Sequence, residues 1–364
     1  MSRPTVVTVV GARPQFVKAA PLSRALRRRV REVLVHTGQH YDPELSDVFF
    51  EQLGIPVPDH HLGVGSGPHG RMTGRVLAAV ESVLMKLRPA MVLVVGDTNS
   101  TLAGALAAVK LGIPVAHVEA GLRSFDDAMP EEINRRATDH LSRLLFCPTP
   151  TAVANLKREG ITRGVHRVGD VMVDAVRQNL ARARKRVPAD LRLAPRSYYL
   201  ATLHRQENVD DPARLRALVD GLSRLPRPVL LPLHPRTRDR LRRLRLRPGG
   251  ALRIRRPVPY LAMLYLASRA RAVLTDSGGL QKEAFILRTP CVTLRDTTEW
   301  VETLEARANR LVGADTGKLL RVVAGLDAVR PRWSAARVYG DGRAAEATAA
   351  VVARFLEVGD GPRR

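Results

Sequence analysis

Residues 91–118 read MVLVVGDTNSTLAGALAAVKLGIPVAHV and carry the clearest signal of the fold. This stretch opens with five apolar residues, turns through Gly96 and Asp97, continues with helical spacing over 102–111, and ends in a second apolar run at 114–118. A short strand that leads through a helix into another strand predicts a βαβ unit. Both runs are apolar throughout rather than alternating, so we expect parallel strands that are covered on both faces.

The same pattern extends outward from this unit. Another helical segment is found at 72–87, and the apolar runs restart after a polar stretch at 181–196 that contains two prolines. The predicted strands are 5–10, 33–36, 91–95, 114–118 and 144–148, followed by 198–203, 229–233, 272–275 and 291–294. We therefore predict an α/β protein with two Rossmann-like domains, each built on a parallel sheet.

The composition is that of a globular protein. The chain has 364 residues, 45% of them hydrophobic, and no apolar run approaches the roughly 18 residues of a membrane span. The N-terminal apolar stretch runs into Gly11 and predicts a first strand rather than a signal peptide. Cys147 and Cys291 lie in distant apolar runs and are expected to be buried, reduced thiols. We expect a cytoplasmic protein without a membrane partner.

The net charge of +24 raises the alternative of a nucleic-acid-binding or regulatory protein. Of the 59 basic residues only seven are lysines, and the arginines cluster at 24–31, 182–196 and 236–256 with few aromatics among them. Base stacking is therefore poorly provided for. We interpret the arginines as solvated faces and expect no nucleic-acid partner; a salt-dependent DNA shift would favour the alternative.

Polar and titratable residues follow the predicted strands, where ligands bind in open α/β sheets. The candidates in the first half are Arg13, Gln39, His40, Asp97, Glu119 and Arg123; those in the second half are His204, Arg205, His234, Ser277, Gly278, Gly279, Arg295 and Asp296. Loops readily supply Gly, Asp and Ser, but not His, Arg and Glu with this regularity. We interpret the set as a ligand site.

The stretch 275–279 (TDSGG) has a direct physical use. Two glycines and a serine before a helix leave backbone N–H groups open to a phosphate, and Glu283 lies one turn further on, where it is placed to receive ribose hydroxyls. No dinucleotide fingerprint follows the first strand, and no HExxH or CxxC spacing is present. We expect neither NAD nor a metal, and we expect His60, His61 and His69 to lie in loops.

The chain resembles the non-hydrolysing UDP-N-acetylglucosamine 2-epimerases. The most specific shared stretches are GDTNSTLAGALAA (96–108), HVEAGLRSF (117–125), MPEEINR (129–135) and TDSGGLQKEA (275–284). Similarity to the subgroup that acts on UDP-2,3-diacetamido-sugar uronic acids lies in GARPQF (11–16), HTGQH (36–40), FFEQLGIP (49–56), ATLHR (201–205) and TEWVE (298–302). Departures are Gln15, where many members have Glu, and Trp300-Val301, where many have Arg-Pro.

The resemblance implies a GT-B fold, with an N-terminal domain at 1–172, a UDP-binding domain at 173–342, a helix at about 343–364 that crosses back, and a cleft between the domains. It implies a UDP-sugar substrate, no cofactor and a homodimer. It also implies acid/base roles for Asp97, Glu119 and Glu131, a catalytic His204, and Lys18 as a further substrate contact. The choice of Glu131 over Glu132 rests on the resemblance.

The implied reaction is 2-epimerisation of UDP-N-acetylglucosamine to UDP-N-acetylmannosamine. Elimination of UDP gives a 2-acetamidoglycal, and UDP then adds back as C2 is protonated on the opposite face. Two alternatives stay open: the same chemistry on a UDP-2,3-diacetamido sugar or its uronic acid, and a GT-B glycosyltransferase, which needs an acceptor site instead of paired acid/base groups.

Overall fold

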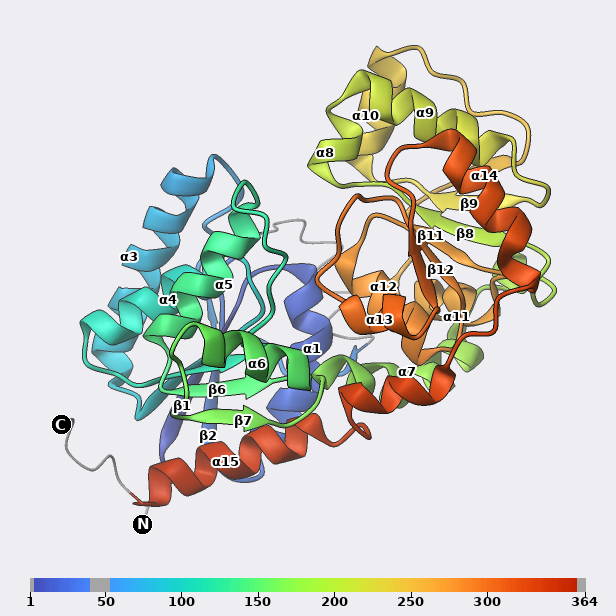
Figure 1. Ribbon diagram of the computed structural model, residues 1–364. Coiled ribbons are helices and arrows are strands. Elements are labelled where there is room, and N and C mark those ends of the chain that lie inside the picture. Colours follow the sequence, from blue (N-terminus) through green and yellow to red (C-terminus); the bar gives the residue numbers. More distant parts are fainter. Residues whose placement is uncertain (1–2, 40–52, 359–364) are drawn as a thin grey trace. The chain divides into compact units, whose positions relative to one another are not determined.

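The computed structural model describes residues 3–39 and 53–358 (Figure 1). The chain divides into two compact units, Met1–Ala175 with Val338–Arg364, and Val176–Arg337. The predicted boundary at 172/173 falls inside one continuous helix, α7 (Val171–Arg186), whose first turns belong to the first unit.

The first unit is built on a parallel sheet of seven strands within the described residues, in the order β3-β2-β1-β4-β5-β6-β7. The strands are β1 (Thr5–Val10), β2 (Arg31–His36), β3 (His60–His61), β4 (Met91–Val95), β5 (Val115–Val118), β6 (Leu144–Cys147) and β7 (Val165–Arg167). The strand order reverses between β1 and β4. Ligands bind outside the carboxyl ends of the strands at such a switch point.

Helices cover both faces of this sheet. They are α1 (Arg13–Leu26), α3 (His69–Leu87), α4 (Asn99–Lys110), α5 (Pro130–Leu141), α6 (Pro150–Arg158), α7 and α15 (Ala344–Val358). One core contains Met72, Val76 and Ala103 of α3 and α4. The opposite core contains Leu22 of α1 and Ala349 of α15, so the C-terminal helix packs in the first unit. Burying each such large side chain stabilises the fold by about 1.5–3 kcal/mol.

The second unit repeats the plan with six parallel strands among the described residues, in the order β10-β9-β8-β11-β12-β13. The strands are β8 (Tyr199–Thr202), β9 (Val229–Pro232), β10 (Leu252–Arg255), β11 (Val273–Thr275), β12 (Cys291–Thr293) and β13 (Asn309–Leu311). Here the order reverses between β8 and β11, which defines a second switch point.

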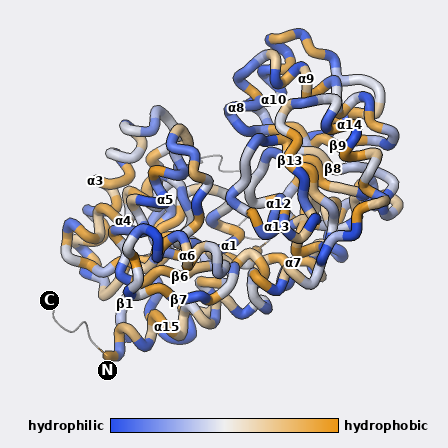
Figure 2. Tube along the Cα trace, in the orientation of Figure 1, coloured by the Kyte–Doolittle hydropathy of each residue, from blue (hydrophilic) through white to orange (hydrophobic). Residues whose placement is uncertain are grey.

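The helices of the second unit are α8 (Gln206–Val209), α9 (Pro212–Ser223), α10 (Pro235–Arg243), α11 (Tyr260–Arg269), α12 (Gly278–Ile286), α13 (Val301–Glu305) and α14 (Thr316–Ala324). Short 3₁₀ turns lie at Ala189–Leu191, Gly325–Asp327 and Trp333–Tyr339. Leucines and valines of α9 and α14 pack on the strands in one core, and the hydropathy colouring of Figure 2 shows apolar strands inside each unit.

All nine predicted strands are present, with ends that shift by at most two residues. Four strands were not predicted: β3, β7, β10 and β13. The prediction that His60 and His61 lie in a loop is wrong, because they form β3, and His69 begins α3 rather than lying in a loop. The two Rossmann-like halves confirm the predicted fold class.

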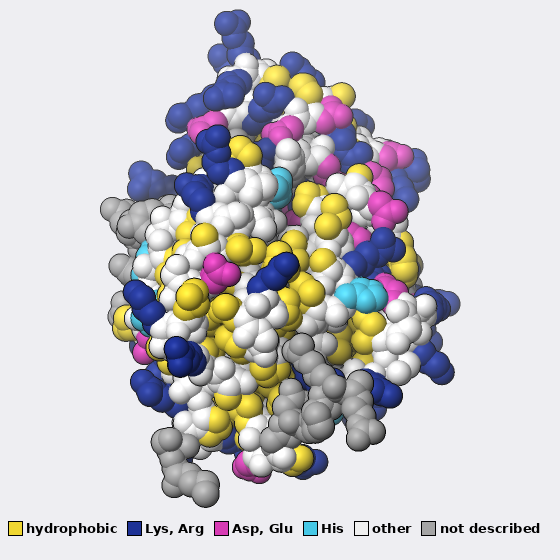
Figure 3. All heavy atoms as spheres, turned by 90° about the vertical axis from the view of Figure 1, so that its left-hand side faces the viewer, with side chains coloured by type: hydrophobic (Ala, Val, Ile, Leu, Met, Phe, Trp, Pro, Cys, Tyr) yellow, Lys and Arg dark blue, Asp and Glu magenta, His cyan; other side chains and the backbone are white. Residues whose placement is uncertain are grey.

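Both cysteines are buried as predicted, and burial raises the pKa of Cys147 and of Cys291 to about 12. In the part of the chain that the structure describes, none of the helices is long and apolar enough to cross a membrane. Basic side chains are spread over much of the face drawn in Figure 3, with hydrophobic side chains between them.

Candidate active site

The carboxyl ends of β4 and β5 carry two of the predicted carboxylates. Asp97 follows β4 through Gly96, which has a φ of +68°, and Glu119 directly follows β5 with a φ of +73°. A non-glycine residue with positive φ is uncommon and worth attention at a functional site. Neighbouring parallel strands thus bring both side chains to the same edge of the sheet.

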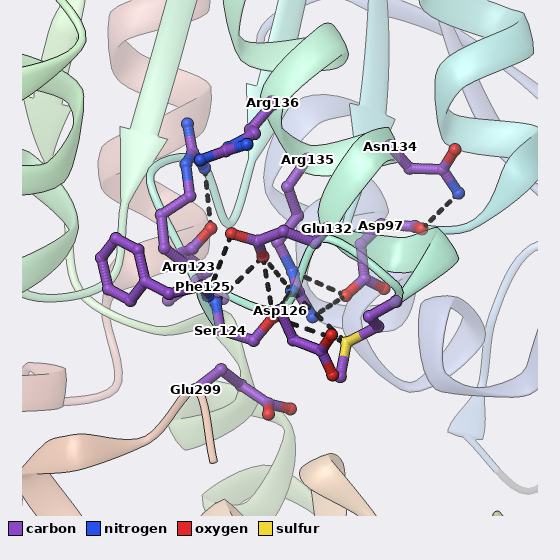
Figure 4. Close-up of polar contacts among 12 residues, drawn as sticks. Asp97, Arg123, Ser124, Phe125, Asp126, Glu132, Asn134, Arg135, Arg136 and Glu299 are labelled. Atoms are coloured by element: carbon purple, nitrogen blue, oxygen red, sulfur yellow. Dashed lines mark hydrogen bonds and ion pairs between the residues drawn. The ribbon is translucent and has the colours of Figure 1, made fainter. Parts of the chain in front are cut away.

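Asp97 is held by the helix α5. Arg135 donates to Oδ2 of Asp97 from Nε at 3.0 Å and from Nη2 at 2.7 Å, and Asn134 donates to the Asp97 carbonyl at 2.9 Å (Figure 4). No described residue donates a hydrogen bond to Oδ1 of Asp97. The cap of the following helix is Thr98 rather than Asp97. The carboxylate is therefore oriented through one oxygen and open at the other.

Glu132 is fully buried in a ring of donors. It accepts hydrogen bonds from the backbone N–H groups of Ser124 and Phe125, from the Ser124 hydroxyl, and from Arg135 at 2.7 Å (Figure 4). Burial raises the pKa of Glu132, but the hydrogen bonds from Ser124 and Arg135 outweigh burial and leave it below its usual value. Glu132 is thus occupied in holding the loop at Ser124, whereas its neighbour Glu131 is half-buried.

Glu119 is buried and forms an ion pair with Lys18 of α1. A buried carboxylate needs such a partner, because an unpaired buried charge is strongly destabilising. Gly96 lies directly beside the pair: a Cβ there would be 3.4 Å from the Glu119 carboxylate and 3.7 Å from the Lys18 ammonium. Lys18, predicted as a substrate contact, is thus also the counter-ion of a predicted catalytic group.

His117 joins these two strand ends from inside the fold. Its Nε2 lies 2.8 Å from the Gly96 carbonyl oxygen, and its Nδ1 lies 2.7 Å from Oδ1 of the buried Asp139. Burial raises the pKa of Asp139, but its contacts with His117 and Arg123 outweigh burial and leave it below its usual value. His117 thus spans the Gly96 carbonyl and the Asp139 carboxylate with its two ring nitrogens.

Arg123, predicted to bind substrate, has its side chain inside the fold. Its guanidinium is buried and contacts both oxygens of Glu159 at 2.6 and 2.7 Å, Asp139 at 2.7 Å, and the Leu122 carbonyl. Burial lowers the pKa of Arg123, but these two carboxylates raise it above its ordinary value. Most of the N–H groups of Arg123 are thus occupied by partners within the fold.

The carboxyl ends of β1 and β2 approach the first turn of α4 closely. Gln39 accepts hydrogen bonds from the backbone and hydroxyl of Ser100, at 3.1 and 2.7 Å. A Cβ at Gly11 would collide with the hydroxyls of Thr37 and Ser100, so this position requires glycine. His40 and the side chain of Arg13, both predicted as substrate contacts, lie outside the described part of the chain.

Gln15, where many members of the resembled family have Glu, uses both ends of its side-chain amide. Its Oε1 accepts from the N–H groups of Gly11 and Ala12, at 2.8 and 2.9 Å, and its Nε2 donates to the Val95 carbonyl at 2.8 Å and to Thr101 at 3.0 Å. A carboxylate has no donor for the Val95 carbonyl at neutral pH. The amide therefore links the start of α1 to the end of β4.

The switch point of the second unit contains His204, which follows β8 near the end of β11. Asp276, fully buried, accepts hydrogen bonds from the backbone N–H groups of His204 and Arg205, both at 2.9 Å. Its other oxygen has no hydrogen-bond partner among the described residues, and the nearest imidazole atom is Nδ1 of His204 at 3.4 Å. This places the acidic group behind the imidazole, with a His204 side chain that is 39% exposed.

The predicted phosphate loop forms the start of α12. Ser277 caps the helix by accepting from Leu280 N–H, and Gly278 and Gly279 form its first turn. A Cβ at Gly278 would collide with the Glu299 carboxylate as it lies in the fold. Glu299 in turn accepts from Nη1 of the buried Arg295 at 3.1 Å, and Arg295 Nη2 has no hydrogen-bond partner among the described residues.

Three other predicted contacts have partners in the fold. Glu283 is buried in α12, where its charge adds to burial in raising the pKa of Tyr260 well above its usual value. His234 caps α10 by accepting from Arg236 N–H at 3.3 Å. Asp296 is exposed and forms an ion pair with Arg214 at 3.1 Å.

Among the described residues no group of three or more His, Cys, Asp or Glu side chains is arranged to hold a metal ion.

Sequence comparison now adds to this geometry. Residues 24–353 match a protein family described as UDP-N-acetylglucosamine 2-epimerase. The chain belongs to the UDP-N-acetylglucosamine 2-epimerase family. The 2-epimerases of this family are isomerases that act on carbohydrates, and the family predicted from the motifs is confirmed.

Two curated members of the 2-epimerase family show how the substrate varies. A UDP-2,3-diacetamido-2,3-dideoxy-D-glucuronate 2-epimerase of Pseudomonas aeruginosa is 52% identical over 318 residues, 85% of this chain and 88% of its own. A UDP-N-acetylglucosamine 2-epimerase of Methanocaldococcus jannaschii is 44% identical over 352 residues, 93% of this chain and 96% of its own.

Solved structures agree with this placement among the 2-epimerases. The M. jannaschii UDP-GlcNAc 2-epimerase in complex with UDP-GlcNAc and UDP matches with a TM-score of 0.89 and 43% identity, covering 98% of this chain and all of that one. A calicheamicin glycosyltransferase, 14% identical with a TM-score of 0.56, shares the fold alone. The halves are thus of the GT-B type.

Several residues that organise this 2-epimerase site were not predicted from the sequence. Arg135 orients Asp97, His117 holds Gly96, Asp276 holds His204, and Glu299 pairs with Arg295. Each lies inside a motif that the sequence analysis quoted or beside a predicted residue. Their roles depend on partners up to 72 positions away in the chain, which spacing alone does not reveal.

Proposed function

We propose that this family member is a non-hydrolysing UDP-N-acetylglucosamine 2-epimerase that interconverts UDP-GlcNAc and UDP-ManNAc. The observation that supports this most is the set at the carboxyl edge of the first sheet: Asp97 open at one oxygen, a buried Glu119, and Glu131 beside a fully engaged Glu132. A similar protein that is 43% identical has been solved with UDP-GlcNAc and UDP bound.

The proposed reaction begins with removal of the proton at C2. The electron pair of that C–H bond forms a C1=C2 double bond, and the C1–O bond breaks with its electrons leaving on UDP. The products of this half-reaction are UDP and a 2-acetamidoglycal. In the return step a UDP phosphate oxygen bonds to C1, and an acid delivers a proton to the other face of C2. The net change is the configuration at C2.

Three side chains supply the proposed acid/base chemistry, which needs a group near each face of the sugar ring. They are Asp97, Glu119 and Glu131. Asp97 offers Oδ1, since Arg135 occupies only Oδ2. The Lys18 ammonium offsets the charge of Glu119 in its buried position. The assignment of base and acid among the three is left open by this proposal.

The second unit supplies the proposed contacts to UDP. Backbone N–H groups at the start of α12, at Ser277 to Gly279, suit an anionic phosphate. Arg295 offers a buried Nη2 beside that loop, and His204 is placed to stabilise the charge that develops on the leaving diphosphate. Arg13, Gln39, His40, Arg205, His234 and Glu283 stay proposed substrate contacts.

A second candidate substrate is a UDP-2,3-diacetamido-2,3-dideoxy uronic acid. It is favoured by the 52% identity to the P. aeruginosa enzyme, against 44% to the M. jannaschii enzyme. The elimination chemistry is the same, because the acetamido group at C2 and the UDP at C1 are common to both sugars. For either substrate we propose a cytoplasmic homodimer without a cofactor that serves polysaccharide or secondary-metabolite biosynthesis.

The test is to incubate the pure protein with each UDP-sugar and to follow the anomeric and H2 proton signals. We expect a second anomeric signal for UDP-GlcNAc, reaching the same equilibrium ratio from UDP-ManNAc. Turnover of the diacetamido uronate alone would replace the first candidate by the second. Consumption of UDP-GlcNAc only with an added acceptor, giving a glycoside and free UDP, would contradict both and favour a glycosyltransferase.

A further inference from the structure

A cavity of about 300 Å³ lies within the second unit, lined by residues between 196 and 333. Its walls are unusually basic. Seven arginines line it: Arg196, Arg271, Arg288, Arg307, Arg310, Arg321 and Arg330. Volumes of this size are at the lower end of the range for small-molecule sites in proteins.

The cavity lies at the amino ends of the strands, whereas the proposed UDP contacts follow their carboxyl ends. Arg196, Arg271, Arg288 and Arg307 precede the first residues of β8, β11, β12 and β13 by two or three positions. These four strands are adjacent and parallel, so their amino ends lie on the same side of the sheet. Ser277 and His204 follow the carboxyl ends of the same strands. A ligand of the cavity is therefore distinct from the UDP of the proposed reaction.

The positive charge of the cavity is largely unbalanced. Asp327 is the sole acidic residue among those that line it, and it pairs with Arg271. Arg330 donates to the carbonyls of Asp327 and Val329, and Arg310 to that of Asn309. None of the lining arginines other than Arg271 forms an ion pair with a described carboxylate. Guanidinium groups are well suited to bind the oxygens of phosphate groups, so a cavity lined by several of them favours a phosphate ligand.

One aromatic side chain completes the wall. Trp333 is half-buried, and its ring lies 6.1 Å from that of Phe285, centroid to centroid. The other tryptophan, Trp300, is buried with Lys282 over its ring and does not line the cavity. Trp333 thus presents a flat apolar surface next to the arginines, suited to a sugar or a base.

We propose that this cavity binds a small molecule that carries three or more linked phosphate groups. Several guanidinium groups on different elements can contact a chain of phosphates at once, whereas a single orthophosphate reaches only a few of them. The small volume and the single aromatic ring fit a small ligand better than a nucleic-acid strand, which needs a groove with several stacking rings.

The test uses the full-length protein saturated with UDP, so that the proposed nucleotide site is occupied. Inorganic tripolyphosphate is titrated by calorimetry at physiological ionic strength. We expect one saturable site, with orthophosphate binding at least about tenfold more weakly. Arg307→Ala and Arg310→Ala should each lower the affinity about tenfold, the usual size for loss of a charged hydrogen bond. The matched control, Arg242→Ala with Arg243→Ala, removes exposed charges of α10 outside the cavity and should change affinity by less than about twofold.

A second arm compares tripolyphosphate with adenosine triphosphate. Tighter binding of the nucleotide, lost in Trp333→Leu, identifies a nucleoside polyphosphate; equal binding, unaffected by Trp333→Leu, identifies a free polyphosphate. The proposal is overturned by the absence of saturable binding, by equal losses in the cavity and control variants, or by displacement of tripolyphosphate as the UDP concentration is raised. Equally tight binding of a short single-stranded RNA, with the same loss in the control variants, would also overturn it. None of these outcomes depends on epimerase activity.

Discussion

Arg135 contacts a single carboxylate oxygen of Asp97, from Nε at 3.0 Å and Nη2 at 2.7 Å. The same guanidinium reaches the buried Glu132 with Nη1 at 2.7 Å. Arg135 is itself almost fully buried, so it fixes Asp97 relative to the loop that Glu132 holds. The geometry makes Arg135 a positioning residue that acts through Asp97.

Replacing Arg135 by lysine tests this positioning. Lysine keeps the positive charge but cannot present two N–H groups to one oxygen and a third to Glu132. We expect kcat to fall on the order of 100-fold, as for a reacting group displaced by about 1 Å, with KM changed much less. The control is Arg136→Lys, because Arg136 is the next residue of α5 and pairs with the exposed Asp127. Equal kinetics for the two variants would contradict the role of Arg135.

We expect substitution of Glu131 to lower turnover and substitution of Glu132 to lower stability. Both carboxylate oxygens of Glu132 accept hydrogen bonds, from Ser124, Phe125 and Arg135, whereas a glutamine side chain has only one oxygen. We therefore expect Glu132→Gln to lower the free energy of unfolding by about 1–3 kcal/mol. Glu131→Gln, at a half-buried position, should lose most of its turnover with a smaller change in the free energy of unfolding. Thermal unfolding and initial rates measure the two effects, and the reverse pattern would exchange the assignment.

His117 should matter for turnover although it is buried away from solvent. Glutamine carries both of its N–H bonds on one nitrogen, so His117→Gln cannot reach Asp139 and the Gly96 carbonyl as the two nitrogens of the ring do, and the turn that carries Asp97 loses its support. We expect kcat to fall by about 10- to 100-fold in folded protein, with a smaller change in KM. His140→Gln, an exposed position on α5, provides the comparison. Unchanged kcat in His117→Gln would show that Gly96 needs no such support.

The sequence predicted the central strands of both sheets and missed the outer ones for a physical reason. All four missed strands, β3, β7, β10 and β13, are the edges of their sheets. Central parallel strands are buried on both faces and need continuous apolar runs. Edge strands are short and polar, as in VHR of β7 and LRIR of β10, and give no such signal.

The residues of the candidate site were also predicted only in part from the sequence. Residues just after a central strand, such as Asp97, Glu119 and His204, were predicted because the carboxyl ends of parallel strands lie on one side of the sheet. Arg123 also follows such a strand, but its side chain turns into the fold toward Asp139 and Glu159. Position after a strand places the backbone at the edge; it does not determine the direction of the side chain.

Acid should destabilise the first unit through His36. Burial, and then the neighbouring His61, lower the pKa of His36 to about 4, and its ring stacks between those of Phe16 and His61. Unfolded His36 takes up a proton near pH 6.5, while the folded form stays neutral. The contribution of His36 to the free energy of unfolding is therefore constant above pH 6.5. As the pH falls from 6.5 toward 4, the free energy of unfolding decreases by about 3 kcal/mol in total.

Denaturant unfolding at pH 7 and at pH 4.5 measures this loss. His36→Phe cannot titrate, so the difference in stability between the two pH values should be smaller in the variant than in the wild type. A reduced stability of the variant at both pH values does not disturb the comparison, because only the difference counts. The same pH difference in both proteins would mean that His36 is not the group responsible.

We propose above that epimerisation proceeds by elimination and re-addition across C1 and C2. The most direct measurement is turnover of UDP-GlcNAc in deuterated buffer, with C2 followed by NMR and mass spectrometry, for the wild type, Glu119→Gln and His204→Ala. The account predicts that the wild-type product carries deuterium at C2. Glu119→Gln should lose most of this exchange. His204→Ala should turn over at least about 100-fold more slowly and release UDP and the glycal into solution. Product that retains its original hydrogen at C2, or near-wild-type epimerisation by both variants, would contradict the account.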